Sequence, residues 1–185
     1  MDETALSKLG KSKTMDTKKP FHDLYLAVYR AHRDAPEIFT DHECNRILTA
    51  IMGGKSFSWR VIGITEAALR KFAEFDFKHI PRQGLTRAHL KPRIETTRTL
   101  LSRNPPYSAG GFMKFWIGKD ETILCAIGEN KISLPSYLPI SNPEGSFFSS
   151  EGKLAGWHHR RRERDFLRGL YEDYRKGNAV PTQIG

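Results

Sequence analysis

Apolar side chains recur with helical spacing in several segments of the chain. The repeat in residues 21–32 stops before Pro36, and a second repeat follows the capping-box residues Thr40 and Glu43. The strongest repeat begins at Leu167, where apolar side chains recur three, four and seven residues later. Helices are predicted for residues 21–32, for the segment between Thr40 and Gly53, for a short segment after Thr65, for residues 94–101 and for residues 157–176.

Shorter segments alternate between apolar and polar residues, as half-buried strands do. The clearest alternation predicts a hairpin near residues 112–127, whose turn holds Gly118 and Asp120. Prolines, glycines and serines over residues 132–156 indicate instead a long loop or lid. Extended segments are predicted over residues 57–64, 75–78, 112–117 and 122–127, and residues 85–90 fit either a strand or a loop.

Helices and strands without a regular βαβ alternation predict the α+β class. The expected fold is a single domain with a small mixed or antiparallel sheet, which includes the hairpin and is flanked by helices. A chain of 185 residues is long enough to bury one sizeable core. We expect this domain to cover residues 21–177, between a flexible leader at 1–20 and a tail at 178–185.

Composition and cysteine usage exclude several classes of protein. The 11 Phe, 3 Trp and 6 Tyr exclude a wholly disordered chain. No run of about 18 apolar residues is present to span a membrane. Cys44 and Cys125 form no CxxC pattern, so neither a cysteine-based zinc site nor a disulfide scaffold is expected. We expect two buried free thiols and a cytoplasmic location, since the leader also lacks the apolar segment of a secretory signal.

The formal net charge of +9 is concentrated in two segments. Residues 79–114 carry seven Lys or Arg against one Glu, and residues 157–185 carry seven against four Asp or Glu. Concentrated positive charge is the expected footprint of a protein that binds phosphate backbones. Nucleic acid, with DNA preferred over RNA, is therefore the predicted partner, and no membrane partner is expected. A basic face that only aids solubility is the alternative.

Two histidines and several arginines lie within residues 79–98. Histidine serves as a general base near neutral pH, and arginine clamps phosphate and stabilises its developing charge. If Arg87 and His89 lie on a strand, they share a face, and a phosphate held by Arg87 would lie beside the imidazole. A basic loop whose histidines only form hydrogen bonds is the alternative. The predicted catalytic residues are His79, His89, Arg93 and Glu95, and the predicted nucleic-acid contacts are Arg82, Arg87, Lys91 and Arg98.

A second basic cluster opens the last predicted helix. Arginines on such a helix would lie along a phosphate backbone or enter a major groove, and the start of the helix would favour an anion. Pairing of these arginines with Glu163 and Asp165 on a solvated face is the alternative. The predicted nucleic-acid contacts in this cluster are Arg160, Arg161, Arg162 and Arg164.

Carboxylates near a basic groove can hold Mg²⁺ for phosphodiester cleavage. Asp120 and Glu129 are the candidate ligands, and Mg²⁺ is the one cofactor considered. Glu129-Asn130-Lys131 also fits the Glu-x-Lys pattern of a metal-nuclease core. His89-Leu90-Lys91-Pro92 has a faint likeness to the His-x-x-Pro core of HNH-type nucleases. The sequence has no upstream Asp-His pair in the usual context of this pattern and no clear downstream Asn and His on the following helix, so no family is assigned.

Absent motifs narrow the function further. The sequence contains no Walker A motif, no GxGxxG, no GxSxG and no HExxH. The favoured hypothesis is a small DNA endonuclease of restriction, phage or mobile-element type, which hydrolyses phosphodiester bonds. A non-enzymatic DNA- or RNA-binding protein, such as a regulator or a plasmid or phage factor, is the alternative. A third hypothesis is an interaction module whose basic faces meet an acidic protein.

Overall fold

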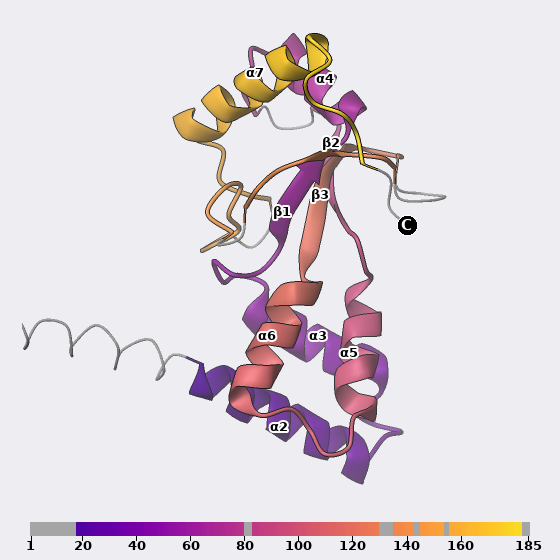
Figure 1. Cartoon of the computed structure of the whole chain (residues 1–185). Coiled ribbons are helices and arrows are strands. Elements are labelled where there is room, and N and C mark those ends of the chain that lie inside the picture. The colour runs from indigo at the N-terminus through magenta and orange to yellow at the C-terminus, as the bar shows by residue number, and fades with distance from the viewer. Residues whose placement is uncertain (1–17, 80–82, 130–134, 143–144, 154–155, 183–185) are drawn as a thin grey trace, which may run out of the picture. The chain divides into compact units, whose positions relative to one another are not determined.

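The structure is a computed structural model of the chain (Figure 1). It describes residues 18–79, 83–129, 135–142, 145–153 and 156–182. These residues form six helices and a four-stranded mixed sheet, which confirms the predicted α+β class. A single domain over residues 21–177 stays a prediction. The chain divides into two compact units, of which the first comprises Met1–Met52 and Pro92–Lys119, and the second Gly53–Lys91 and Asp120–Gly185.

Among the described residues, the first unit consists of helices joined by short connections. Pro20 stands in the first turn of the first of these helices, where its fixed φ fits and its missing N–H costs no helix bond. Residues 19 and 20 therefore belong to this helix rather than to the predicted leader, and residues 1–17 lie outside the described part of the chain. The helices are α2 (Lys19–Asp34), α3 (Asp41–Met52), α5 (Arg93–Ser102) and α6 (Ala109–Lys119).

Aromatic side chains form the centre of the first unit. Tyr25 of α2 and Phe112 of α6 are fully buried and stack nearly parallel, with ring centroids 4.6 Å apart. The Tyr25 hydroxyl donates to the Leu100 carbonyl and accepts from the Tyr107 amide, each at 3.2 Å. These bonds satisfy a polar group that burial would otherwise penalise. One side chain thus connects α2, α5 and the segment before α6.

The predicted hairpin near residues 112–127 is wrong, because residues 112–117 belong to helix α6. Phe112, Met113 and Trp116 are buried together, which fits one face of a helix at spacings of one and four residues. A short apolar run satisfies the helical and the strand period equally well, so this segment alone does not decide between them. The second predicted strand does form, and its partners come from elsewhere in the chain.

The second unit is built on a sheet with the strand order β2-β3-β1-β4. Its central strand, β3 (Glu121–Ala126), runs parallel to β1 (Arg60–Ile64) and antiparallel to β2 (Leu85–His89). The two-residue strand β4 (Leu138–Pro139) pairs antiparallel with the other side of β1. The register places the end of β2 beside the start of β3, which brings two predicted site residues together.

Two helices of the second unit contact each other, α4 (Glu66–Glu74) and α7 (Arg161–Arg175), and α4 also contacts β3 (Figure 1). Thr65 begins α4 as predicted, since its hydroxyl accepts a hydrogen bond from the Ala68 amide at 3.1 Å. Residues 75–78, predicted as extended, instead form a turn after α4. No helix in the described ranges is both long and apolar enough to cross a membrane.

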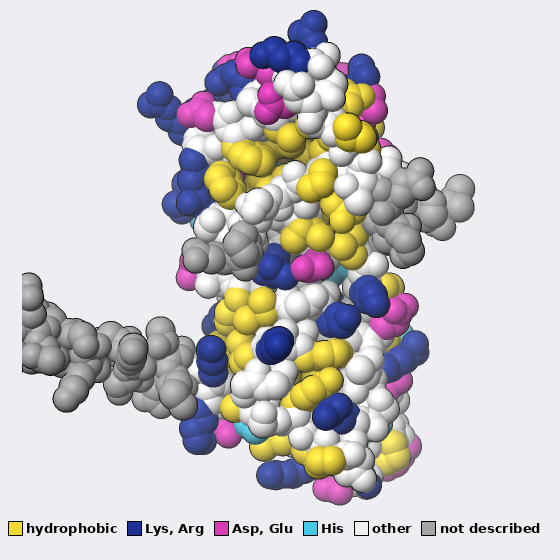
Figure 2. All heavy atoms as spheres, in the orientation of Figure 1, with side chains coloured by type: hydrophobic (Ala, Val, Ile, Leu, Met, Phe, Trp, Pro, Cys, Tyr) yellow, Lys and Arg dark blue, Asp and Glu magenta, His cyan; other side chains and the backbone are white. Residues whose placement is uncertain are grey.

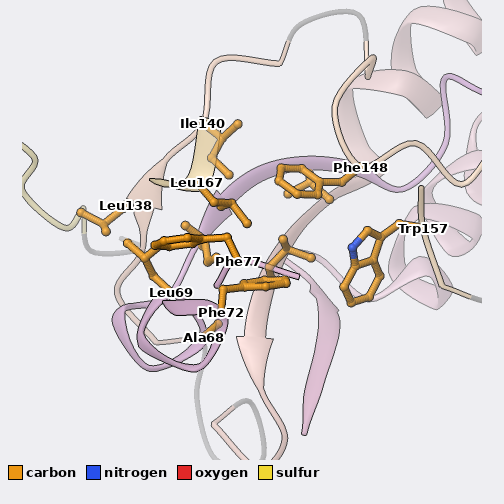
Figure 3. Packing of buried hydrophobic residues seen from close by; sticks show 12 residues of the cluster. Ala68, Leu69, Phe72, Phe77, Leu138, Ile140, Phe148, Trp157 and Leu167 are labelled. Atoms are coloured by element: carbon orange, nitrogen blue, oxygen red, sulfur yellow. The ribbon is translucent and has the colours of Figure 1, made fainter. Parts of the chain in front are cut away.

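Large side chains from α4, α7 and the loops fill the core of the second unit. Figure 3 shows Phe72 within this cluster, with Leu138 on one side and Phe148 and Trp157 on the other. Phe72, Leu138 and Phe148 are fully buried, and Leu167 of α7 closes the cluster. Burial of this apolar surface is the main stabilising contribution to the unit.

Gly63 of β1 tests how tightly this unit is packed. A Cβ at Gly63 would lie 2.1 Å from Cδ2 of Tyr137, so an alanine forces the aromatic ring to move. We expect Gly63→Ala to lower the free energy of unfolding by about 1–3 kcal/mol, measured by urea denaturation. Gly118 of α6 has open space around its Cα, so Gly118→Ala is the control and should be stabilising by up to about 1 kcal/mol. Unchanged stability of Gly63→Ala would show that the ring moves without cost.

Candidate functional site

His89 and Asp120 form a hydrogen-bonded pair where β2 ends and β3 begins. Nε2 of His89 lies 3.0 Å from Oδ1 of Asp120. The two residues meet because β2 and β3 are antiparallel and His89 is paired with Thr122 in the register. The Asp120 side chain is 3% exposed and that of His89 is 15% exposed. A carboxylate buried to this degree needs strong hydrogen-bond donors, and the imidazole is one of them.

Trp59 provides a second donor to Asp120. Its amide donates to Oδ2 of Asp120 at 2.9 Å, and its ring centroid lies 4.2 Å from that of His89. Trp59 adopts the left-handed conformation, with φ of 56°, which is uncommon for a residue with a large side chain. Its carbonyl also accepts hydrogen bonds from Arg87 and Thr122, at 3.4 and 3.2 Å. Such over-determined backbone strain is frequent at functional sites.

The Asp120 contact fixes which nitrogen of His89 carries the proton. The carboxylate is an acceptor, so Nε2 donates, and in the neutral imidazole Nδ1 then holds the lone pair. Nδ1 has no hydrogen-bond partner in the described ranges, and the His89 side chain as a whole is 15% exposed. The arrangement is a partly exposed imidazole held in one tautomer by a buried carboxylate. It can perform general acid–base chemistry.

Arg87 lies beside this pair and is packed between two indole rings. Its Cζ is 4.8 Å from the ring centroid of Trp59 and 5.5 Å from that of Trp157, and Nη2 donates to the Gly156 carbonyl at 2.7 Å. Arg87 and His89 both contact Trp59, which confirms that they share a face of β2. The contacts make Arg87 a structural connection between the β2 strand and the segment before α7. Its role as a phosphate clamp stays a prediction.

His79, the other predicted catalytic histidine, belongs to a different cluster. Its ring centroid lies 4.7 Å from that of Trp157 and 5.8 Å from that of His159. The His159 ring stacks on Phe72 at 5.1 Å, and its Nε2 donates to the Phe77 carbonyl at 2.7 Å. Burial lowers the pKa of both histidines, and the proximity of His159 lowers the pKa of His79 further. The structure therefore does not bring His79 and His89 together as a catalytic pair.

This histidine cluster predicts loss of stability in mild acid. The pKa of His159 lies below its ordinary value of 6.5, so the unfolded chain binds the proton first as the pH falls. The contribution of neutral His159 is complete above pH 6.5 and is lost below it, toward the lower pKa of the folded state. We expect the melting temperature to fall between about pH 7.5 and pH 5.5, and to fall less in His159→Gln. An identical pH dependence in the variant would contradict this assignment.

Arg93 and Glu95, the remaining predicted catalytic residues, lie in the first turn of α5 in the first unit. Arg93 is buried, with its Cζ 5.6 Å from the ring centroid of Trp116, whereas Glu95 is exposed. The predicted catalytic histidines, His79 and His89, belong to the second unit. A catalytic role for Arg93 and Glu95 stays a prediction.

The basic residues predicted to bind nucleic acid lie in several different environments. Lys91 is exposed, Arg98 pairs with Asp41 at 3.0 Å, and Arg82 lies outside the described residues. On α7, Arg161 pairs with Asp165 and Arg162 pairs with Glu163, as the alternative interpretation expected. Figure 2 shows Lys and Arg over α7 interleaved with Asp and Glu. The predicted contacts at this helix are Arg160, Arg161, Arg162 and Arg164, of which the first three are exposed.

The predicted metal ligands Asp120 and Glu129 stand at opposite ends of β3, a strand that spans roughly 20 Å at about 3.3 Å per residue. Asp120 is engaged by His89 and Trp59. Oε2 of Glu129 accepts from the Thr65 hydroxyl and the Ala126 amide, both at 2.6 Å. In the described ranges, no three His, Cys, Asp or Glu side chains group to hold a metal ion. Asp120 and Glu129 therefore do not form one metal site, and dependence on Mg²⁺ stays a prediction. Lys131, which completes the Glu-x-Lys pattern, lies outside the described residues.

Trp59 is the site residue that the sequence did not reveal. Its position in an alternating segment predicts a core strand, whereas the residue precedes β1 and supports the His89–Asp120 pair. Comparisons of the chain with protein-family models, with curated proteins and with solved structures found no match. The functional argument therefore depends on the site itself.

Proposed function

We propose that this protein binds nucleic acid and cleaves phosphodiester bonds, with His89 as the proton-transfer group and Asp120 as its positioning residue. The observation that carries the proposal is the 3.0 Å contact between His89 Nε2 and the buried Asp120 carboxylate. In the neutral ring this contact leaves the lone pair on Nδ1, where a substrate proton can be taken up.

The charge of the chain supports a polyanionic substrate. The net charge is +9, and exposed Lys91 and Arg160 supply positive charge in the second unit. Positive potential attracts phosphate backbones and accelerates encounter with them. The most specific form of the proposal is the endonuclease expected from the sequence, of restriction, phage or mobile-element type. A cytoplasmic location belongs to the same proposal, since both described thiols, Cys44 and Cys125, are free.

The experiment incubates the purified protein with supercoiled plasmid and, separately, with a structured RNA, each at low salt with Mg²⁺ or with EDTA. Cleavage of either substrate that persists in EDTA is expected, because the His89–Asp120 pair needs no metal for proton transfer. Cleavage only with Mg²⁺ would return attention to Asp120 and Glu129. A retarded but uncut band, weakened steeply by salt, would instead support the non-enzymatic binding protein. If the substrates are neither cleaved nor retarded, the proposal is contradicted. An acidic protein would then be the next partner to test.

A further inference from the structure

The site around His89 provides a proton acceptor but no attacking group. No Ser, Thr, Cys or Tyr side chain in the described ranges is hydrogen-bonded to His89. Thr122, its partner in the register, is fully buried and donates to the carbonyls of Trp59 and Arg60. Burial raises the pKa of the Cys125 thiol to about 11, which keeps it protonated and unreactive. With no such side chain among the described residues, the attack that His89 can support there is by an oxygen of water or of the substrate.

Magnitudes decide between these two sources. A positioned general base accelerates a reaction by about 10²- to 10⁴-fold, whereas hydrolysis of phosphate esters by water is among the slowest reactions that enzymes catalyse. A nucleophile already held beside the reacting atom has an effective concentration of about 10⁵–10⁸ M. The ribose 2′-hydroxyl is such a nucleophile, since it lies next to the phosphorus in every RNA linkage. Proton abstraction by one histidine is therefore expected to accelerate cleavage of RNA far more than hydrolysis of DNA.

We infer that the substrate of the His89–Asp120 site is RNA, cleaved by its own 2′-hydroxyl; this inference rests on the proposed function. The 2′-oxygen forms a bond to phosphorus as the bond from phosphorus to the 5′-oxygen breaks. The 2′-hydroxyl proton passes to Nδ1 of His89, and a water molecule protonates the leaving 5′-oxygen. The hydroxide formed then takes the proton from His89. The products are a 2′,3′-cyclic phosphate and a 5′-hydroxyl. DNA, the substrate predicted from the sequence, is the alternative.

The test compares oligonucleotides of one sequence in EDTA. They are all RNA, all DNA, DNA with a single ribonucleotide, and RNA methylated on every 2′-oxygen. The protein is compared with His89→Gln purified in the same way, which controls for contaminating ribonuclease. We expect cleavage of the RNA and of the DNA at its single ribonucleotide, with a cyclic phosphate detected by mass spectrometry. The all-DNA and methylated substrates should react at least about 100-fold more slowly, as should His89→Gln on RNA.

The outcomes separate this inference from the proposed function. Cleavage of DNA and methylated RNA at the rate of RNA would overturn the inference and keep a phosphodiesterase. Products with a linear phosphate formed directly would also overturn it, because they require attack by water. If no substrate is cleaved, or if His89→Gln is as active as the unmodified protein, the proposed function itself fails.

Discussion

Replacing His89 by glutamine is expected to slow phosphodiester cleavage by about 10²- to 10⁴-fold while the protein remains folded. The glutamine amide can still donate to Asp120, which limits the penalty of leaving a buried carboxylate without this partner. It has no nitrogen that takes up a proton near neutral pH, so the chemistry is lost and the contact is kept. Initial cleavage rates at saturating substrate measure this effect, and circular dichroism reports the fold.

His42→Gln is the matched control, because His42 is an exposed histidine on α3 in the first unit. It makes the same chemical change away from the site, and its cleavage rate should equal that of the unmodified protein. Equal rates in the two variants would show that His89 takes no part in the reaction.

Asp120→Asn examines the positioning role at the same site. The Trp59 amide requires an acceptor, so the asparagine oxygen takes that place and its nitrogen turns toward His89. Nε2 would then have to accept, which moves the ring proton to Nδ1 and leaves no lone pair there. We expect a fall in rate of at least about 10²-fold, with KM nearly unchanged. If Asp120 has only a structural role, the substitution should lower the free energy of unfolding and leave the cleavage rate of the folded protein unchanged.

The sequence predicted the individual elements of the fold better than their pairing. Local signals sufficed for α4, because the Thr65 hydroxyl caps it, and for the C-terminal helix, whose apolar spacing is sustained. The sequence predicts a strand over residues 112–117, but this short apolar run fits the helical period equally well. Its helical state depends on a core formed with Tyr25, which is distant in sequence.

The sequence predicts residues of the candidate site but not how they pair, because their pairing also depends on contacts between distant segments. The sequence predicts His89 as a catalytic residue and Asp120 as a metal ligand, and it does not predict that they pair, because the register between β2 and β3 is not a local property. That register places them 3.0 Å apart and separates Asp120 from Glu129. Charge counting also overestimated the basic surface, since Arg93 is buried and Arg98 is paired with Asp41. Side-chain partners of this kind are set by tertiary packing rather than by local sequence.

Phe72→Ala is expected to be the most destabilising of the substitutions considered, lowering the free energy of unfolding by about 3–5 kcal/mol. The Phe72 ring is fully buried in the core of the second unit and stacks on His159, so its removal leaves a cavity and takes away a neighbour of the histidine cluster. The measurement is urea denaturation followed by tryptophan fluorescence, with Trp157 within the same core cluster (Figure 3).

Phe75→Ala is the matched control. Phe75 lies three residues after Phe72, directly after the end of α4, and is 41% exposed. It removes the same atoms, but little of their burial, and should cost below about 1 kcal/mol. The difference between the two variants measures the burial of Phe72, because residue type and local sequence are nearly constant. An equal loss of unfolding free energy in the two variants would mean that Phe72 is not buried in the core. It would also contradict the stacking of Phe72 on His159.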